Sequence, residues 1–338
     1  MSTVFAAPQT MTFRNRHFLK LLDFAPAEIE YLLEAARTLK RLAAARHEKT
    51  TLTGSKVGLL FHRSRPEIRW TSELALASQG AYHHYFGPGE SALGGDDSQT
   101  CSGKLLGRLF DGVAVYGLAQ EKMEDLARYS GLAVCNLGSS TFQPLGVLAD
   151  LLTIKEVSSR PFYELSLTFL GDGRSPIVQS WMVAASKLGI DFRFCGPKDM
   201  QPEETLVETC HALSSETGGQ LRLFTDPEEA VKGADFIYSH SWYTEDEKNW
   251  EKRVKKLFPY RATYSLLSES GNARCFLLHR LPAVVDEDSE YGARCRKLFK
   301  VDGLEVSRDL FDSISNICFE QAENQLHCCK AVMVSLLA

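Results

Sequence analysis

The sequence predicts an α/β protein of two similar domains, each a parallel sheet with helices on both faces, with a ligand cleft between them. Short apolar runs of strand length alternate with segments whose apolar residues recur at helical spacing, a pattern typical of parallel sheets with crossover helices. The chain has 338 residues, which is enough for two domains of ordinary size. We place the first domain at residues 1–150 and the second at residues 151–312.

The first α/β series opens with a helix whose apolar residues recur every three or four positions between Ile29 and Leu42. Strands are expected at residues 56–61, 82–86, 112–116 and 133–136. Helices are expected at residues 66–78, 102–109 and 121–129, between these strands. In an open parallel sheet, ligands bind beyond the carboxyl ends of the strands, so the loops that follow these strands are the candidate site.

The second series follows a long helix expected at residues 144–156. Its strands are expected at residues 165–170, 191–195, 221–224, 236–239 and 275–278. Its helices are expected at residues 177–188 and 203–217, with a helix start at 227–231. A final helix over residues 313–337 is expected to return to the first domain.

Composition excludes several classes of partner. The net charge is −5 and charged residues make up 24% of the chain, so neither a nucleic acid nor a membrane surface is expected as a partner. No stretch approaches the ~20 apolar residues that span a bilayer. We expect a cytoplasmic protein.

Neither a metal nor a cofactor is expected. The nine cysteines include no Cys-x-x-Cys pair, so a zinc site or a disulfide framework is a poor interpretation, and reduced, mostly buried thiols are the simpler one. Gly171 and Gly173 begin a dinucleotide-like fingerprint, but Pro176 stands at the third glycine position.

Several stretches, preserved in order and spacing along nearly the whole chain, resemble the ornithine carbamoyltransferase family. They are His17–Phe24, Gly107–Gly112, Leu148–Thr153, Val231–Phe236, Phe319–Asn324 and Lys330–Met333. The resemblance implies a carbamoyl-phosphate domain followed by an amino-acid domain. It also implies a homotrimer with sites at subunit boundaries, and a small amino-acid-like metabolite as ligand.

The positions that would hold carbamoyl phosphate depart from the family's pattern. The family's Ser-Thr-Arg-Thr-Arg run corresponds to residues 65–69, which read Arg-Pro-Glu-Ile-Arg, so only Arg69 is kept. A family arginine falls on Tyr116, and a lysine lent by the neighbouring subunit falls near Thr100. The family's His-Pro-Thr-Gln corresponds to residues 143–146, which read Gln-Pro-Leu-Gly. An arginine on the last helix falls on Gln325.

The amino-acid side is altered as well. The family's His-Cys-Leu-Pro corresponds to His279–Pro282, which places Arg280 at the cysteine. The aspartate that binds ornithine falls on His240, and an ornithine-binding asparagine falls on Gln179. The Ser-Met-Gly beyond the aspartate falls on residues 244–246, which begin with Thr244 and Glu245.

Two interpretations of Glu67 stay open. A phosphate site at a strand-to-helix turn needs free N–H groups, hydroxyls and cations, whereas Pro66 removes an N–H and Glu67 adds a repelling carboxylate. Ser64 and Glu67 have the spacing of a capping box, so Glu67 is either a helix cap or an acid, base or ligand contact. Arg65 either pairs with Glu67 or Asp96 or contacts a ligand anion.

The other candidates also have a structural and a functional interpretation. His240 and His279 are either satisfied buried histidines or site residues, and Gln143 and Gln325 can bind a neutral ligand without supplying charge. We assign catalytic roles to Glu67, His240, His279 and Arg280. Substrate-binding roles are assigned to Arg65, Arg69, Tyr116, Gln143, Gln179, Thr244, Glu245 and Gln325.

The leading hypothesis is a diverged enzyme of this family that binds an ornithine-, arginine- or citrulline-like amino acid and no longer transfers a carbamoyl group efficiently from carbamoyl phosphate. Two alternatives stay open. One is a catalytically inactive paralogue with a structural or regulatory role, and the other is a residual ornithine carbamoyltransferase with an unusual donor site.

Overall fold

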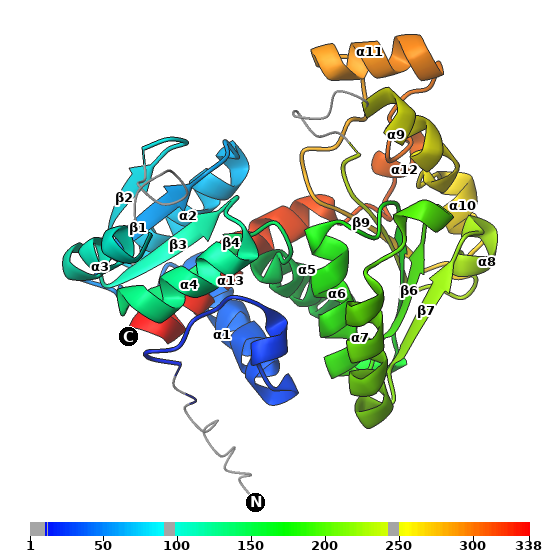
Figure 1. The fold of residues 1–338 in the computed structure, drawn as a ribbon. Coiled ribbons are helices and arrows are strands. Elements are labelled where there is room, and N and C mark those ends of the chain that lie inside the picture. The colour runs from blue at the N-terminus through cyan, green and yellow to red at the C-terminus, as the bar shows by residue number, and fades with distance from the viewer. Residues whose placement is uncertain (1–10, 12, 91–98, 243–249) are drawn as a thin grey trace, which may run out of the picture.

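The computed structural model describes residues 11, 13–90, 99–242 and 250–338 (Figure 1). Within these residues the strands form two sheets, with strand orders β2-β1-β3-β4 and β7-β6-β5-β8-β9. Every strand pair in both sheets is parallel. The predicted class, two parallel sheets flanked by helices, is therefore confirmed.

The first sheet forms the left half of Figure 1, where helices cover its faces. Its strands are β1 (Lys56–Phe61), β2 (Tyr82–Phe86), β3 (Gly112–Tyr116) and β4 (Ala133–Gly138). The helices of this half are α1 (Pro26–Ala44), α2 (Pro66–Ser78), α3 (Gln99–Leu109) and α4 (Gln120–Ser130), preceded by the short 3-10 helix η1 (Leu21–Asp23). Leu59 of β1, which is fully buried, pairs with Tyr85 on one side and Ala114 on the other.

The second sheet is built in the same way. Its strands are β5 (Ser166–Leu170), β6 (Asp191–Cys195), β7 (Gln220–Phe224), β8 (Phe236–Ser239) and β9 (Phe276–His279). The helices among them are α6 (Pro176–Leu188), α7 (Glu204–Thr217) and α8 (Pro227–Val231), with η2 (Phe162–Glu164) and η3 (Lys198–Met200). Phe169 of β5 stacks on Tyr238 of β8 with ring centroids 4.7 Å apart, in the buried core.

Two long helices lie between the sheets in the centre of Figure 1. They are α5 (Pro144–Val157), which is buried from Pro144 to Ile154, and the last helix, α13 (Cys318–Leu337). The side chain of Asn324 in α13 donates to Thr153 of α5 at 3.0 Å, and Lys330 binds Glu48 beyond the end of α1 at 2.9 Å. The last helix thus packs on the first half of the molecule. It begins at Cys318 rather than at residue 313 because the backbone of residues 315–317 pairs with Leu277 of β9 instead of forming a helix.

The sequence analysis did not identify the short elements that follow β8. These are α9 (Trp250–Leu257), η4 (Phe258–Tyr260), α10 (Tyr264–Ser268), α11 (Glu290–Phe299) and α12 (Arg308–Phe311). In α9 the buried residues Trp250, Val254 and Leu257 recur at helical spacing, but the helix has only 8 residues, fewer than the roughly 11 over which a helical period is recognised. Among the described residues, no helix has both the length and the apolar character needed to cross a membrane.

Candidate functional site

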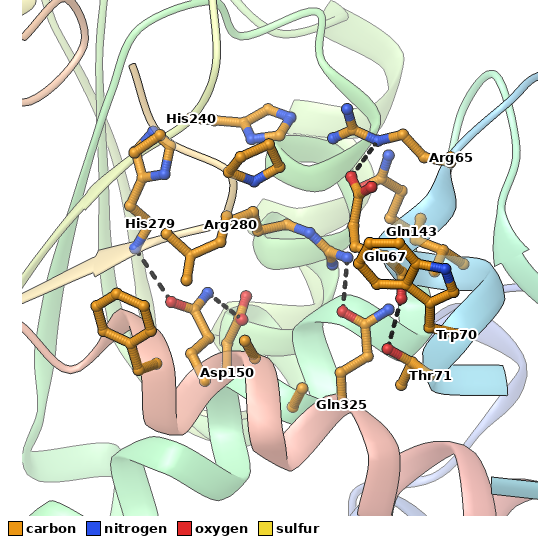
Figure 2. Close-up of a pocket in the computed structure, with 18 of the residues that line it drawn as sticks. Arg65, Glu67, Trp70, Thr71, Gln143, Asp150, His240, His279, Arg280 and Gln325 are labelled. Carbon is orange, nitrogen blue, oxygen red and sulfur yellow. Dashed lines mark hydrogen bonds and ion pairs between the residues drawn. The ribbon is translucent and has the colours of Figure 1, made fainter. Parts of the chain in front are cut away.

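A pocket of about 540 Å³ opens where the loops after the strands of both sheets meet (Figure 2). Tyr116 is the last residue of β3, and His240 directly follows β8. His279 is the last residue of β9, and Arg280 directly follows it. Helices α2, α5 and α13, together with the loop residues Leu281–Ala283 and Phe311 of α12, supply the remaining walls. The size lies within the range of small-ligand sites, and the position agrees with the rule for open parallel sheets.

Most of the candidate residues from the sequence line this one pocket. They are Arg65, Glu67, Tyr116, Gln143, His240, His279, Arg280 and Gln325. The structure thus brings together side chains that are up to 260 positions apart, from Arg65 to Gln325. Their roles in binding or catalysis stay predictions.

Four other candidates are not among the lining residues. Arg69 lies over the Tyr85 ring, 3.7 Å from its centroid, and pairs with Glu73 at 2.9 Å. Gln179 is buried on α6 and donates to the Arg174 carbonyl oxygen at 3.4 Å. Thr244 and Glu245 lie outside the described residues, as does Asp96.

The first turn of α2 carries a carboxylate into the pocket wall. The helix starts with Pro66, so Arg65 is the N-cap residue, and no side chain caps the helix. The expected capping box between Ser64 and Glu67 is therefore wrong, because the helix begins one residue later than that spacing requires. Glu67 instead forms an ion pair with Arg65 at 2.9 Å, with about one third of each side chain exposed (Figure 2).

Arg280 projects from the end of β9 across the start of α5. One of its terminal nitrogens donates to the Gln325 side-chain oxygen at 2.9 Å (Figure 2). The other lies only 1.6 Å from the place where a Cβ atom on Gly146 would stand. A glycine at position 146 is thus what allows the guanidinium to lie against the helix, and its hydrogen-bond partner there is a neutral amide.

A buried polar network supports the end of β9. The Gln321 side chain accepts the His279 backbone N–H at 3.0 Å and donates to Asp150 at 2.5 Å and to the Tyr238 hydroxyl at 3.1 Å. The Trp181 indole N–H donates to the same carboxyl group at 2.9 Å. Asp150 is 1% exposed.

Burial decides the protonation of the groups around Arg280. It raises the pKa of Asp150 to about 6, although Arg280 and the hydrogen bonds from Gln321, Trp181 and Tyr238 act in the opposite direction. Burial lowers the pKa of His279 to about 4. Burial, together with His279 and Arg280, also holds the pKa of His240 well below its usual range. Both imidazoles are therefore neutral at pH 7, and neither adds to the positive charge of Arg280.

Several lining residues escaped the sequence analysis: Trp70, Asp150, Phe319 and Gln321. Asp150 is the one charged residue in the buried part of α5, from Pro144 to Ile154, and a carboxylate there points to a buried partner. Trp70 carried no comparable signal, because an aromatic residue in a mixed helix turn usually joins the core.

Across the chain as far as the structure describes it, no group of three or more His, Cys, Asp or Glu side chains could hold a metal ion.

The fold and the pocket define a two-domain α/β protein with a ligand site between its sheets. Residues 16–156 match the family model described as aspartate/ornithine carbamoyltransferase, carbamoyl-P binding domain. Residues 163–336 match the corresponding Asp/Orn binding domain. The chain belongs to the aspartate/ornithine carbamoyltransferase family.

Ornithine carbamoyltransferases are similar to this chain along nearly their full length. The catabolic ornithine carbamoyltransferase of Chromobacterium violaceum is 39% identical over 329 residues, covering 96% of this chain and 98% of the relative. Ornithine carbamoyltransferase 1, catabolic, of Staphylococcus epidermidis is 37% identical with the same coverage. The solved ornithine carbamoyltransferase of Pyrococcus furiosus is 27% identical, with a TM-score of 0.86 over 97% of this chain and 99% of that one.

Proposed function

We propose that this chain is an ornithine carbamoyltransferase-like enzyme with a remodelled donor site. It binds an ornithine-, arginine- or citrulline-like amino acid in the pocket and does not transfer a carbamoyl group efficiently from carbamoyl phosphate. The observation that carries the proposal is the guanidinium of Arg280, which faces the pocket with the neutral Gln325 as its hydrogen-bond partner.

The donor side argues against carbamoyl phosphate. A phosphate at the start of α2 would meet Pro66, which has no N–H, and the carboxylate of Glu67, which already neutralises Arg65. By resemblance, contacts are lost at Pro66, Glu67, Ile68 and Tyr116. At about 1.5 kcal/mol for each contact, the loss is roughly 6 kcal/mol, or on the order of 10⁴-fold in affinity.

The acceptor side argues for an altered ligand. A guanidinium repels the side-chain ammonium group of free ornithine, and the neutral His240 cannot act as its counter-ion. Five N–H donors in a planar fork suit an oxygen acceptor, such as the oxygen of a ureido, acyl or carboxylate group. We therefore expect citrulline and side-chain-acylated ornithine to bind better than ornithine.

The names of the relatives favour a second candidate, a residual ornithine carbamoyltransferase. The catabolic enzymes that carry this name are 37–39% identical to the chain. An inactive paralogue with a structural or regulatory role is the third candidate. In one form of this third candidate, Arg280 would pair with Glu67 and fill the pocket, leaving no room for a ligand. The open pocket of about 540 Å³ around Arg280 argues against that form. A homotrimer and a cytoplasmic location remain part of the proposal.

Two measurements on the purified protein separate these candidates. The first is formation of citrulline from ornithine and carbamoyl phosphate. The second is the shift in melting temperature with carbamoyl phosphate, ornithine, citrulline and Nδ-acetylornithine, for the wild type and for Arg280→Ala. We expect negligible turnover and a shift with the last two ligands that Arg280→Ala abolishes.

The control is Arg128→Ala, which removes an exposed guanidinium of α4 outside the pocket. Rapid formation of citrulline would instead support the second candidate function, a residual ornithine carbamoyltransferase. A protein that responds to none of the four ligands, and whose Arg280→Ala variant only melts at a lower temperature, would establish the inactive paralogue.

A further inference from the structure

A buried carboxyl group forms part of the pocket wall near Arg280. Asp150 lines the pocket, although only 1% of the residue is exposed. In the view of Figure 2, the side chain of Arg280 extends past Asp150 toward Gln325. Burial favours the protonated form of Asp150 and raises its pKa to about 6, while the charge of Arg280 favours the ionised form. This carboxyl group can therefore change its charge near neutral pH.

Two helices place the guanidinium and the carboxyl group at neighbouring levels of the pocket. On α5, Gly146, against which a terminal nitrogen of Arg280 lies, precedes Asp150 by four residues. On α13, Gln325 accepts a hydrogen bond from Arg280. Gln321, four residues before it, donates to Asp150. Residues four apart lie on one face of a helix, about 6 Å apart along its axis, so the guanidinium lies about one helical turn from a buried carboxyl group.

The groups that face Asp150 from the neighbouring elements keep their charge near neutral pH. Burial raises the pKa of the phenol of Tyr238 on β8 and of the thiols of Cys318 and Cys328 on α13, so all three stay neutral. The indole N–H that α6 contributes does not titrate. At the end of β9, burial lowers the pKa of His279 to about 4, and the guanidinium that follows it stays charged. Among the described residues around Arg280, Asp150 is thus the group whose charge changes between about pH 5.5 and pH 7.5.

We propose that Asp150 determines the charge of the ligand group that Arg280 accepts, and that at neutral pH this group is an uncharged carbonyl oxygen. The proposal rests on the proposed function, because it takes Arg280 as the donor to the side chain of the bound amino acid. An ionised Asp150 balances the charge of Arg280 and repels a second anion at that distance. A neutral acyl or ureido oxygen accepts the same N–H donors without that repulsion. A side chain that ends in a carboxylate binds only after Asp150 takes up a proton.

This coupling sets the size of the expected pH dependence. With its pKa raised by burial to about 6, Asp150 is protonated in about 3% of the molecules at pH 7.5 and in about 75% at pH 5.5. The apparent affinity of a ligand is reduced by the fraction of the protein that is competent to bind it. An anionic side chain should therefore bind roughly 25-fold more tightly at pH 5.5 than at pH 7.5, and a neutral side chain should show little change.

The test is calorimetric titration at pH 5.5, 6.5 and 7.5 with Nδ-acetylornithine and Nδ-oxalylornithine, which carry a methyl group and a carboxylate at the same position. In the wild type, affinity for the oxalyl compound should rise roughly 25-fold toward pH 5.5, and affinity for the acetyl compound should change less than about twofold. Asp150→Asn should bind the oxalyl compound equally well at all three pH values. Glu67→Gln removes the other carboxylate of the described pocket lining and should keep the pH dependence.

A second readout needs no variant and holds even if Asp150→Asn fails to fold. Titration of the wild type at pH 7 in two buffers with different ionisation enthalpies gives the number of protons taken up on binding. About 0.9 proton should be taken up for each oxalyl compound bound, and close to none for the acetyl compound. Melting temperatures of both variants identify a loss of folding separately.

Three outcomes would overturn the inference. Binding of both compounds without pH dependence or proton uptake would remove the role of Asp150 and leave the proposed function intact. An unchanged pH dependence in a folded Asp150→Asn variant would assign the titration to another group. Absence of binding for both compounds at every pH would overturn the proposed function as well.

Discussion

The guanidinium of Arg280 occupies the space that any side chain on Gly146 would need, with a terminal nitrogen 1.6 Å from the missing Cβ. By resemblance, the family carries a glutamine at position 146 and a cysteine at position 280. Here the long side chain belongs to Arg280, and position 146 is a glycine without a side chain. The two positions therefore act as one unit, because both cannot hold a long side chain at once.

Gly146→Ala should move Arg280 without unfolding the protein. The clashing atom is the end of a flexible side chain, so the guanidinium can shift, and alanine favours a helix over glycine by about 1 kcal/mol. We expect binding of Nδ-acetylornithine to fall at least tenfold in Gly146→Ala. Calorimetry on Gly146→Ala, Arg280→Ala and the double variant gives the coupling between the two positions. Equal losses from Gly146→Ala with and without Arg280 would show that the two side chains act separately.

Glu67→Gln should make the start of α2 more receptive to phosphate. The substitution removes the carboxylate that repels an anion and frees Arg65 from its ion pair. We expect the affinity for carbamoyl phosphate and for inorganic phosphate to rise about tenfold, as measured by calorimetry at low salt. Glu73→Gln is the control, since Glu73 pairs with Arg69 outside the pocket lining. An equal gain in both variants would point to net charge alone.

The fold was predictable because each strand is a short apolar run between polar turns. Residues 82–86, 112–116 and 236–239 were predicted with the bounds that the structure gives. The ends of some helices were less predictable: the last helix was expected from residue 313 and begins at Cys318. The helices after β8 and before α13 have 4 to 10 residues, which is shorter than the roughly 11 residues over which periodicity identifies a helix.

The candidate site was predictable where the resemblance placed a residue after a strand, as for His240, His279 and Arg280. The site was not predictable where the direction of a side chain decides whether the residue lines the pocket. Arg69 lies only two positions from Glu67, yet it turns to Glu73 and Tyr85 instead of the pocket. The space shared by Arg280 and Gly146 is a tertiary contact that no local pattern contains.

Asp150 and His279 should give opposite pH dependences of stability. The pKa of Asp150 is raised to about 6, so its protonation contributes stability that appears as pH falls from about 6 to 4. The pKa of His279 is lowered to about 4, so stability is lost as pH falls from about 6.5 to 4. Each contribution is about 3 kcal/mol at most.

The two terms can be separated by substitution. Relative to wild type, the free energy of unfolding of Asp150→Asn should decrease as pH falls through this window, and that of His279→Gln should increase. Urea denaturation at pH 4.5, 5.5 and 7 gives both differences. Parallel pH dependences of the two variants and the wild type would mean that neither group is shifted in the folded protein.

Lys330→Ala should destabilise the protein strongly. Lys330 on α13 is 3% exposed and binds both carboxylate oxygens of Glu48 at 2.9 Å, while Gln79 donates to the same carboxylate at 2.7 Å. Removal of the cation leaves a mostly buried carboxylate without its counter-charge, which costs about 3–5 kcal/mol. Urea denaturation should show this loss, whereas Arg128→Ala, which breaks the exposed pair with Asp125, should have little effect. A loss of less than about 1 kcal/mol in Lys330→Ala would argue against a tight attachment of α13.

The charge preference of the pocket is the central claim, and calorimetric titration of the wild type with ornithine and with Nδ-acetylornithine at pH 7 tests it most directly. The two ligands share their backbone groups and differ in the charge of the side-chain amine. Because Arg280 repels that charge and donates to the acyl oxygen, the acetylated ligand should bind at least tenfold more tightly. Tighter binding of free ornithine would contradict the account, and it would mean that the pocket still selects the amine on which carbamoyl transfer takes place.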